Sequence, residues 1–183
     1  MEKTVSSKLI YSGRVVRLRV DTVQSAGGRR TTREIVEHDD CVAIVPLDEN
    51  GKVLLVKQYR KPIEKELLEI PAGGIDPGED AESAVRRELR EETGYLPRKV
   101  KRLGGFYASP GYSSEYLHLY LATDLIRSPL RAEDTDEIKL VRVPVSQLRT
   151  LVTSGAICDD KSIAGIYLFL EHYREYRRRH SSA

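Results

Sequence analysis

The hydrophobic positions in the first third of the chain fall into short runs that are typical of β-strands. Residues 8–13, 14–23 and 31–38 show partial alternation of apolar and polar side chains, and a turn signal at Ala26-Gly27-Gly28 separates the last two. Residues 41–48 are nearly all apolar, which is typical of a strand buried on both faces. Asn50-Gly51 lies between this run and the apolar run 52–60, a pattern that predicts a hairpin.

The rest of the chain mixes extended runs with helical periodicity. Residues 66–74, 99–109, 116–125 and 137–145 are predicted to be extended. A helix is predicted over about 80–93, ended by Gly94 in a left-handed cap. Its predicted core face consists of Ala81, Ala84, Val85 and Leu89.

Two further helices are predicted near the end of the chain. Ser146 is a candidate N-cap for a helix over 147–154. A final helix over about 160–178 carries an apolar stripe at helical spacing, formed by Ile163, Ile166, Tyr167, Leu170 and Tyr173. Strands and helices that mix without strict alternation predict an α+β fold, in which a mixed β-sheet lies between helices as an α/β/α sandwich.

Length and composition narrow the class of protein. A chain of 183 residues is expected to hold one main domain. We assign residues 41–183 to it, and residues 1–40 to a small N-terminal subdomain with an antiparallel sheet. The formal net charge of +2 indicates no general attraction to nucleic acid or membranes.

The cysteines and the apolar runs indicate the cellular compartment of the protein. Cys41 and Cys158 lie far apart in no metal-like spacing, which favours reduced thiols. No run has the length of a membrane span or the core of a signal peptide. We therefore expect a cytoplasmic protein.

Four glutamates around the first predicted helix carry the strongest chemical signal. Glu88, Glu91 and Glu92 lie three and four residues apart, so they share one helix face, and Glu79 precedes that helix. Carboxylates packed this densely repel one another unless a cation lies among them. A hard divalent cation such as Mg²⁺ or Mn²⁺ prefers these oxygen ligands. The plainer alternative is a solvated helix laced with Arg–Glu ion pairs, but that does not explain the flanking glycines.

The spacing resembles that of a known enzyme family. Gly73 is followed by five residues, then Glu79, seven residues and the run Arg87-Glu88-Leu89-Arg90-Glu91-Glu92-Thr93-Gly94-Tyr95. This 23-residue pattern resembles the Nudix box at every defining position. The family hydrolyses nucleoside diphosphates linked to another moiety, and its fold is a mixed sheet between helices.

The resemblance implies roles for the box residues. Glu88 and Glu92 match the principal metal ligands, and the carbonyl of Ala72 matches a main-chain ligand. Glu91 would share a second ion and act in catalysis with Glu92, while Glu79 would reach the same cluster. Structural support of the site would come from Arg87, which holds the glutamates through ion pairs, and from Gly73 and Gly94.

A second segment bears on the substrate. Pro110 stands 15 residues after Tyr95, inside Ser109-Pro110-Gly111 followed by Glu115. This arrangement resembles the ADP-ribose pyrophosphatase branch of the family, although Pro-Gly alone is simply a turn. In that resemblance Arg33 lies near the adenine and Arg60 near the phosphates or terminal ribose. Pro110, Gly111 and Glu115 complete the candidate substrate-binding set.

An acidic loop before the last predicted strand holds the candidates for the general base. In the branch it resembles, a further glutamate on a mobile loop orients or deprotonates the attacking water. Residues 132–137 form that loop here, and Glu137 fits best, with Glu133 second. A solvated acidic loop without catalytic function is the alternative.

The resemblance therefore implies Mg²⁺-dependent hydrolysis of ADP-ribose to AMP and ribose 5-phosphate, with Mn²⁺ as a possible substitute. The alternatives are a pyrophosphatase for another sugar nucleotide, such as ADP-glucose or GDP-mannose, and a Nudix-like module that binds a nucleotide without cleaving it. RNA decapping or hydrolysis of damaged nucleoside triphosphates has less support. A homodimer is expected, because the N-terminal strands resemble a domain exchanged between subunits and would leave exposed edges.

Overall fold

The computed structural model describes residues 1–132 and 137–180, which form two compact units. The first unit consists of Met1–Asp40 together with Tyr107–Tyr116. The second contains the remainder of the described chain. Glu133, one of the two candidate bases, lies outside the described residues.

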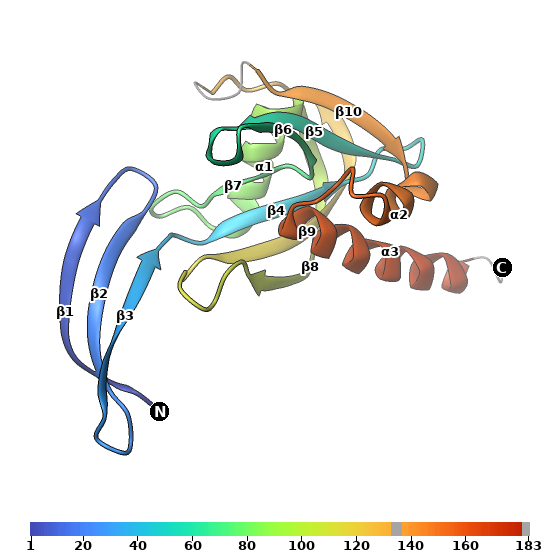
Figure 1. Cartoon of the computed structure of the whole chain (residues 1–183). Coiled ribbons are helices and arrows are strands. Elements are labelled where there is room, and N and C mark those ends of the chain that lie inside the picture. Colours follow the sequence, from blue (N-terminus) through green and yellow to red (C-terminus); the bar gives the residue numbers. More distant parts are fainter. Residues whose placement is uncertain (133–136, 181–183) are drawn as a thin grey trace. The chain divides into compact units, whose positions relative to one another are not determined.

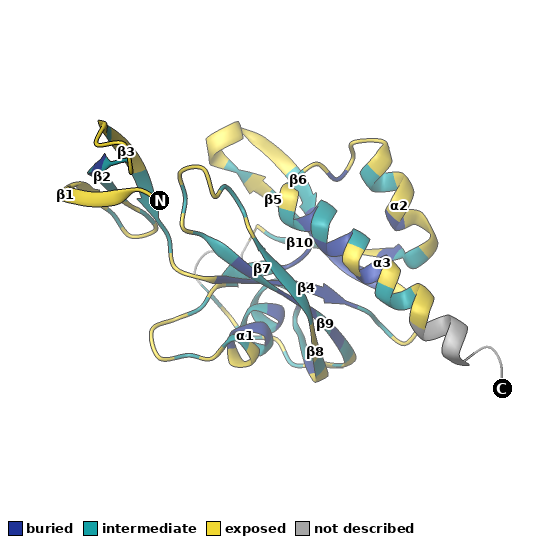
Figure 2. Cartoon of the chain, turned by 90° about the horizontal axis from the view of Figure 1, so that it is seen from below, coloured by how far each residue is buried: buried dark blue, intermediate teal, exposed yellow. Residues whose placement is uncertain are grey.

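The first unit is an antiparallel sheet of three strands, in the order β1-β2-β3 (Figure 1). The strands are β1 (Lys3–Ser12), β2 (Arg17–Gln24) and β3 (Arg30–Glu37). β1 is exposed along its whole length, as Figure 2 shows. The loop 108–115 is joined to this sheet, because Val36 N–H donates to the Tyr112 carbonyl at 2.8 Å and the Val36 carbonyl accepts from Ser114 N–H at 3.0 Å.

The second unit has two sheets. One has the order β7-β4-β9-β8 and the other the order β10-β5-β6. β4 runs parallel to β9 and antiparallel to β7, so the first of these sheets is mixed. The strands are β4 (Cys41–Pro46), β5 (Lys52–Arg60), β6 (Lys65–Glu69), β7 (Ala72–Gly74), β8 (Tyr95–Tyr107), β9 (Tyr116–Arg127) and β10 (Lys139–Pro144).

Helices cover both faces of the mixed sheet (Figures 1 and 2). The helices are α1 (Ala81–Thr93), α2 (Val145–Thr153) and α3 (Asp160–His180), with a short 3₁₀ turn η1 (Lys61–Ile63). Val42 and Ile44 of β4 share a buried cluster with α1. On the other face, α3 approaches so closely that a Cβ on Gly165 would lie 2.7 Å from Ile70 Cδ1 and 3.8 Å from Val45 Cγ2. Because β4 side chains alternate between these faces, the fully buried strand predicted from the apolar run 41–48 is confirmed.

The first helix forms as its sequence predicts. Asp80 is its N-cap and accepts hydrogen bonds from the N–H groups of Glu82 and Ser83 at 3.0 Å. Gly94 ends it with a φ of 79°, which is the left-handed conformation that favours glycine. Ala84, Val85 and Leu89 are fully buried, and Ala81 is partly buried against the same cluster, so the predicted core face is confirmed.

The Asn50-Gly51 turn reverses the chain as predicted: Leu47 and Val53 form an antiparallel bridge, and Asp48 N–H donates to the Lys52 carbonyl at 2.9 Å. The antiparallel pairing is short, because β4 takes β7 and β9 as partners whereas β5 pairs with β10 and β6. The prediction of Ser146 as an N-cap was wrong: α2 begins at Val145, with Pro144 before it and no side-chain cap.

No disulfide joins Cys41, which is buried, and Cys158, which is exposed. Among the described residues, no helix has the length and apolar character needed to cross a membrane.

Candidate active site

The candidate site is built around one arginine of α1. Arg87 Nε and Nη2 donate to the two carboxylate oxygens of Glu79 at 3.1 and 2.8 Å. Its Nη1 donates to Glu88 at 2.6 Å and to Glu91 at 3.3 Å. Nη2 also donates to the Gly74 carbonyl at 2.8 Å. One guanidinium thus gathers three of the four box glutamates and ties them to the loop that precedes the helix.

The fourth box glutamate is bound to the backbone of that loop. Glu92 Oε2 accepts a hydrogen bond from Ala72 N–H at 3.1 Å. Since Ala72 begins β7, this bond fixes the strand end that carries the predicted carbonyl ligand. Glu92 and Ala72 are therefore brought together, as are Glu79, Glu88 and Glu91.

The Glu88 carboxylate leaves no room for a side chain at Gly73. A Cβ at Gly73 would lie 2.1 Å from Glu88 Cδ and within 2.3 Å of both carboxylate oxygens. The Glu88 carboxylate therefore packs directly against the backbone of β7, and only glycine leaves room for it. Gly94, by contrast, acts at a distance from the carboxylates, through the left-handed end of α1.

The electrostatics of the four carboxylates differ. Hydrogen bonds from Arg87 hold the pKa of Glu79 below its ordinary value. Burial raises the pKa of Glu88, and the charges of Glu91 and Glu79 raise it further. Burial, followed by the charge of Glu88, raises the pKa of Glu92 to about 8. The four carboxylates carry more negative charge than Arg87 balances. Together with burial, this excess raises the pKa values of Glu88 and Glu92.

This donor set fits a hard divalent cation. All of its side-chain donors are carboxylate oxygens, which Mg²⁺ and Mn²⁺ prefer. Within the described chain, no three of these glutamates bring ligand oxygens within 4.8 Å of one another. The carboxylates must therefore approach one another more closely before they share a cation.

The residues predicted to bind substrate lie in different units. Arg60 belongs to the second unit, with the box, whereas Arg33, Pro110, Gly111 and Glu115 belong to the first. Arg33 is exposed and donates to both carboxylate oxygens of Glu2 at 3.2 and 2.5 Å. Pro110 and Gly111 are exposed in the loop 108–115.

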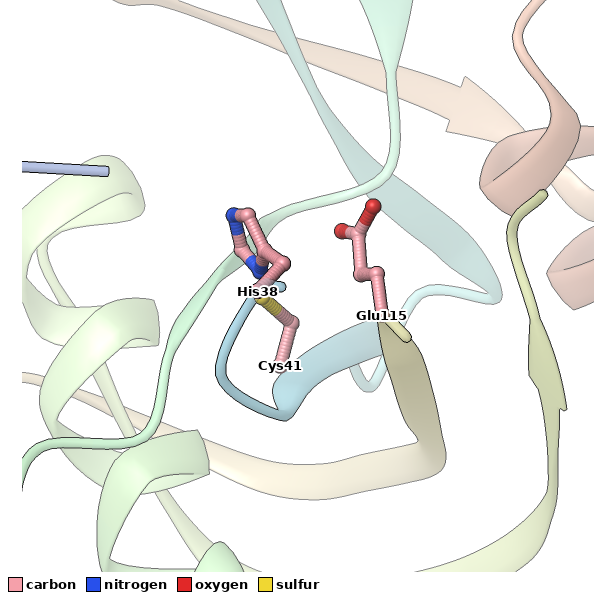
Figure 3. Close-up of side chains that lie close together, drawn as sticks. All are labelled: His38, Cys41 and Glu115. Atoms are coloured by element: carbon pink, nitrogen blue, oxygen red, sulfur yellow. The ribbon is translucent and has the colours of Figure 1, made fainter. Parts of the chain in front are cut away.

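Glu115 lies near His38 in the first unit (Figure 3). Ligand atoms of the two side chains approach within 4.8 Å, and His38 Nδ1 is also 2.7 Å from the Asp39 carbonyl oxygen. The figure also draws Cys41, the first residue of the second unit. Two ligands within one unit fall short of a metal site.

Sequence reasoning did not find the partner of Arg60. Arg60 Nε and Nη2 donate to Glu69 at 2.9 and 2.7 Å, and Lys161 of α3 donates to the same carboxylate. The sequence did carry a signal for such a partner. Glu69 stands in the apolar run 66–74, and a glutamate is almost never fully buried without a charged partner. Glu137, the remaining candidate base, is exposed before β10.

Comparison with known proteins identifies the family. The NUDIX domain model matches residues 37–164, which include the whole carboxylate site. The chain belongs to the Nudix family. The model of the nucleoside diphosphate sugar hydrolase N-terminal domain matches residues 2–36 of this Nudix hydrolase.

Relatives with established names extend over nearly the whole chain. The ADP-ribose pyrophosphatase of Bacillus subtilis is 39% identical over 173 residues, which cover 93% of this chain and 94% of that protein. The methanol dehydrogenase activator of Bacillus methanolicus is 38% identical and covers 96% of this chain and 97% of its own. The predicted likeness to the ADP-ribose pyrophosphatase branch is thereby confirmed.

The fold also matches a solved structure. The crystal structure of an ADP compounds hydrolase superposes with a TM-score of 0.87, at 22% identity, over 100% of this chain and 97% of that one. The predicted α+β fold, with its mixed sheet and small N-terminal antiparallel sheet, is confirmed.

The close packing of Glu88 on Gly73 leads to a first prediction. Gly73→Ala should weaken Mg²⁺ binding about ten-fold or more, because the added methyl group displaces the Glu88 carboxylate. Titration calorimetry with Mg²⁺ measures this. Gly74→Ala is the matched control, since a Cβ there has no neighbour within 4 Å and the backbone carbonyl is kept. Equal affinities of the two variants would contradict the assignment of Glu88 as a ligand.

The raised pKa of Glu92 leads to a second prediction. Between pH 4.5 and about 8 the folded metal-free protein keeps a proton on Glu92 that the unfolded chain has lost. This side chain's contribution to the free energy of unfolding should therefore fall as the pH rises through that window. One proton contributes a slope of at most about 1.4 kcal/mol per pH unit.

Urea denaturation in excess chelator at several pH values checks this second prediction. Glu92→Gln should flatten the decline relative to the unaltered protein, because the amide does not titrate. Glu175→Gln, at an exposed position of α3, should leave the slope unchanged. A Glu92→Gln variant that loses stability as steeply as the unaltered protein would show that Glu92 does not titrate in this window.

Proposed function

We propose that this Nudix hydrolase cleaves the diphosphate of ADP-ribose with Mg²⁺, giving AMP and ribose 5-phosphate. The observation that carries the proposal is the carboxylate cluster of a complete Nudix box, held around Arg87 beside β7. The substrate is supported by the segment at Pro110, by the match of residues 2–36 and by the Bacillus subtilis relative named ADP-ribose pyrophosphatase.

The box residues would bind the metal ion and hold one another in place. Glu88, Glu92 and the carbonyl of Ala72 would hold Mg²⁺, with Glu91 and Glu79 completing the set. The bound ion would neutralise diphosphate charge and make a water molecule more acidic. Arg87 keeps the carboxylates in place through its hydrogen bonds, and Gly73 admits the Glu88 carboxylate against the strand.

Other side chains bind the substrate and move the proton. Arg60 would take the diphosphate, since a guanidinium matches phosphate oxygens with two parallel N–H groups. Arg33, Pro110, Gly111 and Glu115 would contact the adenosine and ribose portions. Glu137, or Glu133 in the same acidic segment, would accept the proton of the attacking water, with Glu91 as a further candidate.

Hydrolysis of another sugar nucleotide is the nearest alternative, because the box serves any nucleoside diphosphate. The relative named methanol dehydrogenase activator does not weaken the proposal, since that name states an effect on another enzyme and no chemical step. We also propose a cytoplasmic location, supported by two cysteines that no disulfide joins.

A substrate panel tests the proposal. With Mg²⁺, and with Mn²⁺ in a parallel series, ADP-ribose should have the highest kcat/KM among ADP-ribose, ADP-glucose and GDP-mannose. AMP and ribose 5-phosphate are measured as products. Glu92→Gln should lower turnover at least a hundred-fold while the folded state persists, because it removes a charged ligand. Intact ADP-ribose beside a cleaved sugar nucleotide would reject the substrate, and near-normal turnover of the variant would reject the metal assignment.

The first unit supports a second proposal, that the protein is a homodimer. β1 is an exposed edge strand that carries Val5, Leu9, Ile10 and Tyr11, each at least 43% exposed. An apolar edge strand of this kind favours association with another chain. Sedimentation equilibrium should give twice the chain mass of 20.7 kDa. Leu9→Lys with Ile10→Lys should shift the protein to monomer, and a monomeric unaltered protein would overturn the proposal.

A further inference from the structure

A buried carboxylate joins the end of β6 to the start of α3. Glu69 is 1% exposed and accepts hydrogen bonds from Arg60 and from Lys161. Lys161 lies far along the chain, in the first turn of α3, and its ammonium group donates to the Oε2 atom that also receives Arg60 Nη2. Three charged groups from three elements thus meet on one side of the second unit.

Burial of this cluster does not by itself stabilise the fold. Removing charged groups from water has a large free-energy cost, and apolar residues of similar volume often stabilise a core as well or better. The cluster also includes Asp159, whose Oδ1 accepts from Lys161 at 2.8 Å, so it holds two positive and two negative side chains. Its formal net charge is zero, and its hydrogen bonds orient its members.

The orientation that matters is that of Arg60. A guanidinium has five N–H groups, and Glu69 binds its Nε and one N–H of Nη2. Three N–H groups remain, including a pair at the far end that matches two oxygens of a phosphate. The Arg60 side chain is 37% exposed, so part of it is accessible to a ligand.

Arg60 also lies within electrostatic reach of the box. Arg60 binds Glu69, and Ala72, three residues further along the chain, donates its N–H to Glu92 at 3.1 Å, so one short segment contacts both Arg60 and the box. An arginine clamped on one side and open at the other, near the carboxylate cluster, suits a diphosphate that is held at the metal ligands.

Lys161 is itself held firmly. Its neighbour Ser162 accepts a hydrogen bond from Ile70 N–H at 2.8 Å, and Ser162 N–H donates to Asp159 at 3.0 Å. Two consecutive residues of the strand segment, Glu69 and Ile70, are therefore bound by two consecutive residues of the helix. The Glu69 carboxylate itself is restrained by its two bonds from Arg60 and its bond from Lys161.

We propose that Lys161 is a positioning residue for the Nudix reaction: it locks the Glu69 carboxylate, which in turn aims the open end of Arg60 at the diphosphate. The inference rests on the proposed function, in which Arg60 contacts the substrate. Without Lys161, Glu69 has one cationic partner and turns with it, so the Arg60 side chain samples several directions.

A double-mutant cycle on kcat/KM for ADP-ribose tests this. Lys161→Met and Arg60→Ala should each lower kcat/KM about ten-fold, mainly by raising KM. Each variant loses the same contact, the one between the open end of Arg60 and the diphosphate. The double variant should be no worse than Arg60→Ala alone. Lys161→Arg should recover most of the loss, since arginine keeps the charge and the donors.

Lys57→Met is the matched control. It removes a lysine from an exposed ion pair with Glu66, 2.7 Å long, on the neighbouring strands β5 and β6. This variant should keep the KM of the unaltered protein. If Lys161→Met unfolds, Glu69→Gln replaces it in the cycle, because the amide keeps the shape and one acceptor.

The outcomes separate the two proposals. Losses that multiply in the double variant, or an unchanged KM for Lys161→Met, would overturn the positioning role. Calorimetric binding of the α,β-methylene analogue of ADP-ribose should follow the same pattern without turnover. Failure of the unaltered protein to cleave ADP-ribose would instead reject the proposed substrate, and the cycle is then measured on the panel compound that it does cleave.

Discussion

Repulsion among carboxylates that must stay close together is the constraint on which the site depends. Four glutamates lie in and before one helix, and Arg87 is the cation that gathers three of them. The helix spacing aligns the side chains, but the contact with Glu79 and the Gly74 carbonyl joins the helix to the preceding loop. The guanidinium therefore organises a negatively charged site before any metal enters it.

Backbone geometry makes this arrangement possible at two positions. Gly73 allows the Glu88 carboxylate to lie against β7, and Glu92 binds the N–H of the residue just before it. The mixed sheet supplies the support, since β4 pairs with β7 and packs against α1 through Val42 and Ile44. A buried strand thus places the loop and the helix of the box at a fixed separation.

A second charged cluster, around Glu69, lies in the same unit and differs in its charge balance. Arg87 serves more carboxylates than it can neutralise, which leaves room for a divalent cation. Around Glu69 the charges balance, and the group is buried where the start of α3 meets the end of β6. The excess of carboxylates around Arg87 suits a divalent cation, whereas the members of the balanced cluster are oriented by hydrogen bonds to one another. In our proposals these tasks become metal binding and the aiming of Arg60.

The sequence by itself determined the local chemistry and most of the elements. The carboxylate spacing, the Gly94 cap, the core face of α1 and the buried run of β4 follow from short-range periodicity and backbone preference, which depend on neighbouring residues alone. Tertiary structure decided what depends on contacts between distant segments. The antiparallel pairing at the Asn50-Gly51 turn is short because β4 and β5 enter different sheets, and Glu69 meets Lys161 across 92 positions. Such pairings arise from burial of whole faces, and no local pattern encodes which distant charge will reach a buried carboxylate.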